Sequence, residues 1–118
     1  MKLNEYQNKA QKTALYGENV KVAVKRKNVA LLVYTALGLA GEAGEFVDKV
    51  KKLLRNNKGR LDKEQKEALI KELGDVLWYI AEAARQLGVS LEDVAKKNLL
   101  KLSDRARRGV LHSEGDNR

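Results

Sequence analysis

The 118-residue sequence has no cysteine, no proline and a single histidine, and each scarcity excludes a class of protein. Without cysteine there is no disulfide scaffold, no thiolate metal site and no cysteine nucleophile. His112 alone cannot build a carboxylate-histidine di-iron site, which needs a histidine on each of two helices, and its isolation argues against a Ser-His-Asp triad. The site classes that remain need neither a thiolate nor a pair of imidazoles.

Long apolar runs are scarce as well. The first residues, MKLNEYQNKAQK, contain no apolar stretch of signal-peptide length. No window approaches the roughly 20 apolar residues that span a bilayer. We therefore expect a soluble, cytoplasmic protein without a membrane partner.

Length and composition indicate one helical domain. A chain of 118 residues leaves room for one domain, and its 43% apolar content supports a core despite 34% charged residues. The lack of proline and the 5% aromatic content favour helix over sheet. We predict an all-α protein with a single domain over residues 1–108 and a flexible tail over residues 109–118. The formal net charge of +8 should attract phosphates, nucleotides or nucleic acid.

Periodicity and capping patterns predict four helices. We read Asn4 with Gln7, Asp62 with Gln65, and Ser90 with Asp93 as pairs that cap helix starts. The conformation of the basic, β-branched stretch 20–27 is left open. The predicted helices begin near Asn4, Asn28, Asp62 and Ser90 and end near Gly17, Arg55, Gly88 and Arg108.

Three glycines, Gly38, Gly41 and Gly44, fall inside the second predicted helix. Each costs about 1 kcal/mol relative to alanine in a helix interior, so some gain should offset them. Close helix packing is one explanation and room for a ligand beside the backbone is the other. The sequence leaves both open.

Two acid-x-x-acid pairs stand out, Glu42 with Glu45 and Glu72 with Asp75. Spacing alone is weak evidence, because a chain with sixteen acids carries such pairs by chance. Both pairs, however, border apolar stripes and lack an obvious local counter-charge. If the two helices pack as neighbours, four negative charges would share a partly desolvated groove, which costs several kcal/mol unless cations fill it.

Hard divalent cations suit such a groove. Mg²⁺ prefers oxygen ligands and shares its shell with waters and phosphates, so carboxylates without histidine or cysteine indicate Mg²⁺ or Mn²⁺ over zinc. The alternative is that the acids form structural ion pairs with Lys49, Lys52, Arg85 or basic residues of the last helix.

The motifs resemble those of a known family. The segments LGLAGEAGEFVDKVKK and ELGDVLWYIAEAARQLGVSLEDVAKKNLLKL, which carry the two acid pairs, are similar to MazG-like nucleoside triphosphate pyrophosphohydrolases of the all-α pyrophosphatase superfamily. The resemblance covers Leu31 to Gly109. It implies a four-helix MazG-like bundle assembled as a homodimer or a dimer of dimers. It also implies Mg²⁺-dependent hydrolysis of (deoxy)nucleoside triphosphates to a monophosphate and pyrophosphate, with a house-cleaning role in nucleotide metabolism.

The resemblance also assigns residues. Glu42, Glu45, Glu72 and Asp75 match the family's metal ligands, and it implies that Glu42 or Glu45 also helps to activate the attacking water. Trp78 is expected to point away, into the core or an interface. The residues implied to bind substrate are Lys49, Lys52, Tyr79, Asn98, Lys101 and Arg105. For the four basic residues among these, a solvated surface or ion pairing is the alternative.

Other functions remain possible from the sequence. Within the superfamily, the same carboxylates would serve a narrower substrate such as dUTP or phosphoribosyl-ATP. A basic helical nucleic-acid-binding module is suggested by the clusters at residues 21–27 and 105–108, although few aromatic residues and no recognisable reading helix argue against it. A purely structural helix bundle with ion-pair networks is the third reading.

Overall fold

The structure is a computed structural model that describes residues 1–17 and 27–117. These ranges contain helices α1 (Leu3–Gln11), α3 (Lys27–Asn56), α4 (Lys63–Gln86) and α5 (Leu91–Arg107), and no strand. The all-α prediction is confirmed. The stretch whose conformation the sequence left open, residues 20–27, lies outside the described residues apart from Lys27, which begins α3.

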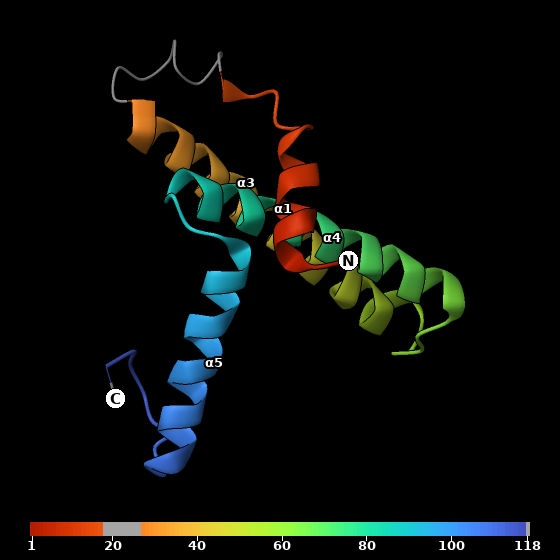
Figure 1. The fold of residues 1–118 in the computed structure, drawn as a ribbon. Helices are drawn as coiled ribbons and strands as arrows, with labels where there is room; N and C mark the ends of the chain where they lie inside the picture. The colour runs from red at the N-terminus through yellow and green to blue at the C-terminus, as the bar shows by residue number, and fades with distance from the viewer. Residues whose placement is uncertain (18–26, 118) are drawn as a thin grey trace.

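Helices α3 and α4 form an antiparallel pair joined by a short turn (Figure 1). Lys58 and Gly59 adopt the left-handed conformation in this turn, with φ of 53° and 74°. The predicted cap of α4 is confirmed, since the Asp62 side chain accepts from the Gln65 backbone N–H at 2.9 Å and the Gln65 side chain accepts from Asp62 N at 3.2 Å. This capping box fixes where α4 starts, and hence which of its residues face α3.

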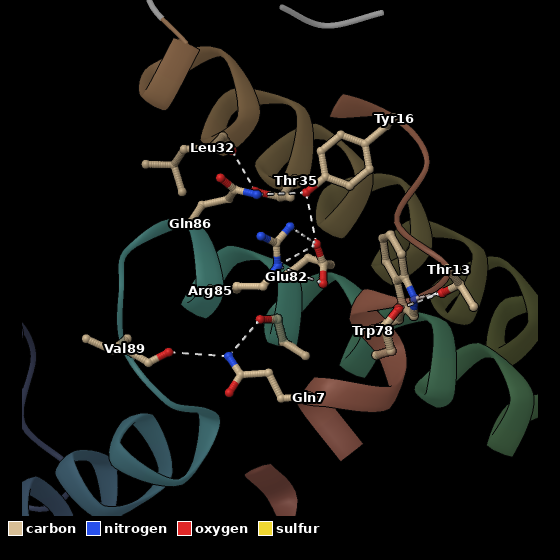
Figure 2. Close-up of polar contacts among 12 residues, drawn as sticks. Gln7, Thr13, Tyr16, Leu32, Thr35, Trp78, Glu82, Arg85, Gln86 and Val89 are labelled. Carbon is tan, nitrogen blue, oxygen red and sulfur yellow. Dashed lines mark hydrogen bonds and ion pairs between the residues drawn. The ribbon is translucent and has the colours of Figure 1, made fainter. Parts of the chain in front are cut away.

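Helix α1 packs against α4 and the start of α5, and its predicted cap is wrong. Asn4 lies inside α1; its side chain accepts from the Glu92 backbone N–H at 3.0 Å and donates to the Glu92 carboxylate at 2.8 Å. Buried Gln7 accepts from Leu91 N at 3.1 Å and donates to the carbonyl of Val89 at 3.3 Å (Figure 2). Both amides therefore satisfy the free backbone groups at the start of α5, because the first N–H groups of any helix lack partners within it.

Helix α5 runs away from the α3–α4 pair (Figure 1). Its predicted cap is confirmed, because Ser90 Oγ accepts from the Asp93 backbone N–H at 3.0 Å. It contacts α1 and α4, but among the described helices it makes no contact with α3. The radius of gyration is 17.3 Å, whereas a compact domain of this length has about 13–14 Å. A single chain is therefore more extended than a closed four-helix bundle.

The single chain buries little apolar surface. In the described ranges the buried apolar residues are four alanines and one leucine: Ala10, Ala30, Ala81, Ala84 and Leu91. Five large apolar side chains on α3 remain half exposed or more at helical spacing. We call them the α3 stripe: Val29, Val33, Leu37, Val47 and Leu54.

The expectation that no segment has the length and apolarity of a membrane span needs correction. By length and composition alone, α3 is apolar enough over Val29–Asn56 to cross a bilayer, and only 11% of its most apolar window is buried. The helix also carries Glu42 and Glu45, and carboxylates within a membrane-spanning segment are costly. The finding shows that α3 presents a long surface that needs covering.

Candidate metal centre and substrate pocket

Three of the predicted acids come together between α3 and α4. Glu42 and Glu45 project from α3, and Glu72 projects from α4. One carboxylate oxygen of each lies within 4.8 Å of those of the other two. The i, i+3 spacing places the first pair on one helix face, and the antiparallel packing of α4 brings the buried Glu72 opposite them.

Asp75, one turn beyond Glu72, belongs to the same electrostatic environment. The pKa of Glu42 is raised, first by desolvation and then by the charges of Asp75, Glu45 and Glu72. Glu42 and Asp75 also line one open cavity of about 290 Å³. The structure thus brings three of the four predicted metal ligands together, and the fourth, Asp75, lies outside that group but lines a cavity with Glu42.

Lys49 supplies the counter-charge within this cluster. Its ammonium lies 3.2 Å from Glu72 Oε1, which is one of the ion pairs that the structural alternative foresaw. One lysine does not balance four carboxylates. Lys52 turns away, since it pairs with Asp48 at 2.6 Å, and Lys51 binds the same carboxylate at 2.8 Å. The two lysines lower the pKa of Asp48 to about 2.

The donor set fits a hard divalent cation. All the converging groups are carboxylate oxygens, the ligands that Mg²⁺ prefers, and the excess negative charge favours a cation. An ion about 2.1 Å from each ligand needs opposing oxygens no more than about 4.2 Å apart. The oxygens of Glu42, Glu45 and Glu72, which lie within 4.8 Å of one another, are close to that size.

Of the three glycines in α3, Gly38 supports the packing explanation. At Gly38 a Cβ atom would overlap the ring of Tyr79, so this glycine permits close packing of α3 on α4. Gly41 and Gly44 have nothing within 4 Å of the position of a Cβ atom. Gly44, two residues beyond Glu42, points to the opposite side of α3, so this open space is not room beside the acids.

Tyr79 and Trp78 both line the cavity with Glu42 and Asp75. Trp78 was expected to point away from Tyr79, but the two residues line one cavity. The interface expected for Trp78 stays a prediction. The indole N–H of Trp78 donates to Thr13 Oγ1 at 2.7 Å, and Thr13 also lines the cavity (Figure 2). Sequence reasoning missed Thr13 because it lies 65 residues from Trp78 and carries no motif signal.

The predicted substrate residues of α5 do not reach the acids in the single chain. Asn98 and Lys101 are exposed, and Arg105 is only 4% exposed. The C-terminal residues turn back alongside α5 (Figure 1), where Arg105 Nη2 donates to the backbone carbonyl of Asp116 at 2.8 Å and to its carboxylate at 3.2 Å. Lys101 lies 3.4 Å from the same carboxylate. The mobility predicted for this tail stays a prediction.

The sequence matches known proteins over most of its length. Residues 33–110 match the MazG nucleotide pyrophosphohydrolase domain. The chain is 44% identical to the Gene 37 protein of Mycobacterium phage L5 over 118 residues, which cover all of both chains. It is 55% identical to the uncharacterized protein YvdC of Bacillus subtilis (strain 168) over 42 residues, 36% of this chain and 40% of that protein. No solved structure matches it.

Proposed function

Since the chain belongs to the MazG nucleotide pyrophosphohydrolase family, we propose that it hydrolyses (deoxy)nucleoside triphosphates between the α and β phosphates in the presence of Mg²⁺. The products are a nucleoside monophosphate and pyrophosphate. The observation that carries the proposal is the convergence of Glu42, Glu45 and Glu72 beside the cavity that Asp75 lines. These carboxylates, with no nitrogen or sulfur donor among them, match what a metal-dependent attack of water on a phosphoanhydride requires.

The residues around the cluster have separate tasks in this reaction. The four carboxylates would hold the metal, which would neutralise charge on the triphosphate and lower the pKa of the attacking water. Water adds to the α phosphorus, the bond to the bridging oxygen breaks, and pyrophosphate leaves. Glu42 or Glu45 would accept the water proton, since both carboxylates project from α3 into the cluster. Lys49, whose ammonium lies 3.2 Å from Glu72 Oε1, would neutralise a phosphate oxygen of the substrate.

The test is product analysis with a panel of ribo- and deoxyribonucleoside triphosphates. We expect equal amounts of monophosphate and pyrophosphate with Mg²⁺, loss of turnover on chelation, and recovery with Mg²⁺ or Mn²⁺. The melting temperature should also rise on addition of Mg²⁺, because the ion relieves repulsion among the carboxylates. Release of single phosphates, or turnover that survives chelation, would contradict the proposal.

We also propose that the active form is a homodimer or homotetramer. A second copy of the chain would cover the exposed α3 stripe and add to the small apolar core of this extended chain. Among the described helices, α5 does not contact α3. We therefore propose that Asn98, Lys101 and Arg105 reach the acidic cluster of a second copy.

The assembly is tested by sedimentation and activity together. Val47→Glu places a charge in the α3 stripe and is expected to give monomers with little activity. Leu15→Glu, at an 86% exposed position outside the stripe, is the control that should leave the assembly intact. A wild-type protein that is monomeric at assay concentration and fully active would rule the assembly out.

We place the reaction in the cytoplasm, as nucleotide-pool house-cleaning. The nucleic-acid-binding alternative has little support among the described residues. Arg105 pairs with Asp116, and Arg107 and Arg108 each bind the Asp104 carboxylate at 2.8 Å, so acids offset the C-terminal basic cluster. The other basic cluster, residues 21–27, lies outside the described residues apart from Lys27.

A further inference from the structure

The C-terminal segment, which we define as residues 109–117, folds back along α5 (Figure 1). Gly109 adopts the left-handed conformation with φ of 71°, and the Val110 backbone N–H donates to the carbonyl of Arg105 at 3.0 Å. A second reversal occurs at Gly115, where φ is 84°. These two reversals bring Asp116 beside Arg105, eleven residues earlier in the chain.

Asp116 supplies an anion to two cations of α5. Arg105 Nη2 donates to the Asp116 backbone carbonyl at 2.8 Å, to its carboxylate Oδ1 at 3.2 Å and to the Gly115 carbonyl at 3.3 Å. Lys101 Nζ lies 3.4 Å from the same Oδ1. The hydrogen bonds from Arg105 and then Lys101 lower the pKa of Asp116, so its carboxylate is ionised at neutral pH. One negative group is thus held between the two cations.

The segment satisfies Arg105 only in part. The Arg105 side chain is 4% exposed, and its Nε is buried without a hydrogen-bond partner among the described residues. A buried donor of a charged group that lacks a partner costs free energy. A guanidinium presents its N–H groups as a planar fork, which two oxygens of one phosphate can satisfy together. Asp116, whose side chain is 84% exposed, is therefore a weaker ligand for this fork than a phosphate.

The end of α5 does not depend on Asp116. The backbone N–H groups of Arg108 and Gly109 donate to the carbonyls of Asp104 and Ala106 at 3.0 and 3.1 Å, which closes the last turn of the helix. The contacts of Asp116 with Lys101 and Arg105 are thus additional to the helix end, and their main effect is to occupy the two cations.

We propose that the C-terminal segment is an internal competitor of the substrate, in which the Asp116 carboxylate occupies Lys101 and Arg105 until a polyphosphate displaces it. The inference rests on the proposed function, in which these two residues bind the substrate, and it adds regulation of that site. Arg105 Nη2 cannot serve the segment and a phosphate together. The fraction of molecules with the segment bound therefore raises the apparent KM, whereas kcat is unchanged once the segment has left.

Asp116→Asn and Glu114→Gln form a matched pair of variants. Each removes one negative charge from the same exposed segment, but Glu114 is not an ion-pair partner of Lys101 or Arg105 among the described residues. Asp116→Asn should lower the KM for nucleoside triphosphates about two- to fivefold, the range expected for an exposed ion pair, with kcat unchanged. Glu114→Gln should leave both constants at the wild-type values.

Gly115→Val tests the same contact without changing any charge. A β-branched residue is strained at the φ of 84° found here, although nothing lies within 4 Å of the position of its Cβ atom. The variant should release the segment through its backbone and lower KM in the same direction as Asp116→Asn.

Release of the segment can be observed without any hydrolysis. The chain has no cysteine, so Asn117→Cys at an exposed position accepts a single nitroxide spin label. We expect a restricted component in the electron paramagnetic resonance spectrum, which inorganic tripolyphosphate without Mg²⁺ removes and potassium chloride of equal ionic strength does not. Combined with Asp116→Asn, the label should be mobile from the start.

The outcomes separate this inference from the proposed reaction. Equal KM values for the wild type and Asp116→Asn, or a label that tripolyphosphate does not release, would overturn the competition while leaving the reaction in place. If no triphosphate is hydrolysed, the reaction fails, and the competition is then supported only if Asp116→Asn binds tripolyphosphate about two- to fivefold more tightly by calorimetry and Glu114→Gln does not.

Discussion

Replacing Glu42 or Glu72 by glutamine is expected to reduce pyrophosphate release by more than a hundredfold. Each substitution keeps the shape of the side chain but removes a charge from the cluster of carboxylates that lie within 4.8 Å of one another. Loss of a residue that only supports a metal ligand costs about 10–100-fold in activity or metal affinity, so loss of a ligand should cost more. The measurement is pyrophosphate release at saturating nucleotide and Mg²⁺.

The stability of the metal-free protein gives an independent readout for Glu42→Gln. A carboxyl whose pKa is raised by folding binds protons more tightly in the native state, so its ionisation destabilises the fold as pH rises through that pKa. Glu42→Gln should therefore be at least as stable as the wild type at neutral pH without metal, and should gain less from Mg²⁺.

The matched control is Glu5→Gln, which removes an exposed acid from an ion pair with Lys9, and neither residue lines the cavity. It should retain wild-type turnover. If the Glu42 and Glu72 variants both kept more than a tenth of wild-type activity, the acids would be structural and the metal centre would lie elsewhere.

Replacing Glu82 by alanine is expected to destabilise the protein by about 3 kcal/mol. Glu82 has no exposed surface, yet its carboxylate accepts from Arg85 Nη2 at 2.7 Å and from the Tyr16 hydroxyl at 3.1 Å (Figure 2). Gln86 completes the network by donating to the Tyr16 hydroxyl at 3.1 Å. Removing one partner of a buried ion pair costs about 3–5 kcal/mol, and the partly exposed Arg85 should keep the loss near the lower limit. Urea unfolding measures it.

Glu5→Ala is the matched control for this second prediction. The Glu5–Lys9 pair has the same 2.7 Å separation, but both side chains are more than half exposed, so its loss should cost less than about 1 kcal/mol. Replacing Glu82 and Arg85 together by leucine should recover part of the stability, because no buried charge is then left unpaired. If Glu82→Ala lowered the free energy of unfolding no more than Glu5→Ala does, water would have to solvate the Glu82 carboxylate in the folded protein.

The sequence predicts where α4 and α5 start and that α3 is a long apolar helix. These features depend only on residues close to one another in the chain. A helix start needs an acceptor three residues before a free N–H, and Asp62 and Ser90 provide one at that spacing. The pairing of α3 with α4 follows from their short connection, and it is sufficient to bring Glu42 and Glu45 opposite Glu72.

Tertiary structure decided every contact whose best partner is distant in sequence. The same local rule predicted a cap at Asn4 and Gln7, but their amides bind the start of α5, more than 80 residues away. Gly38 differs from Gly41 only because Tyr79 packs against one of them, and Trp78 faces the cavity because Thr13 accepts its N–H. Sequence specifies which groups need partners within one helical turn; packing alone determines which partner a side chain finds when several segments compete for it.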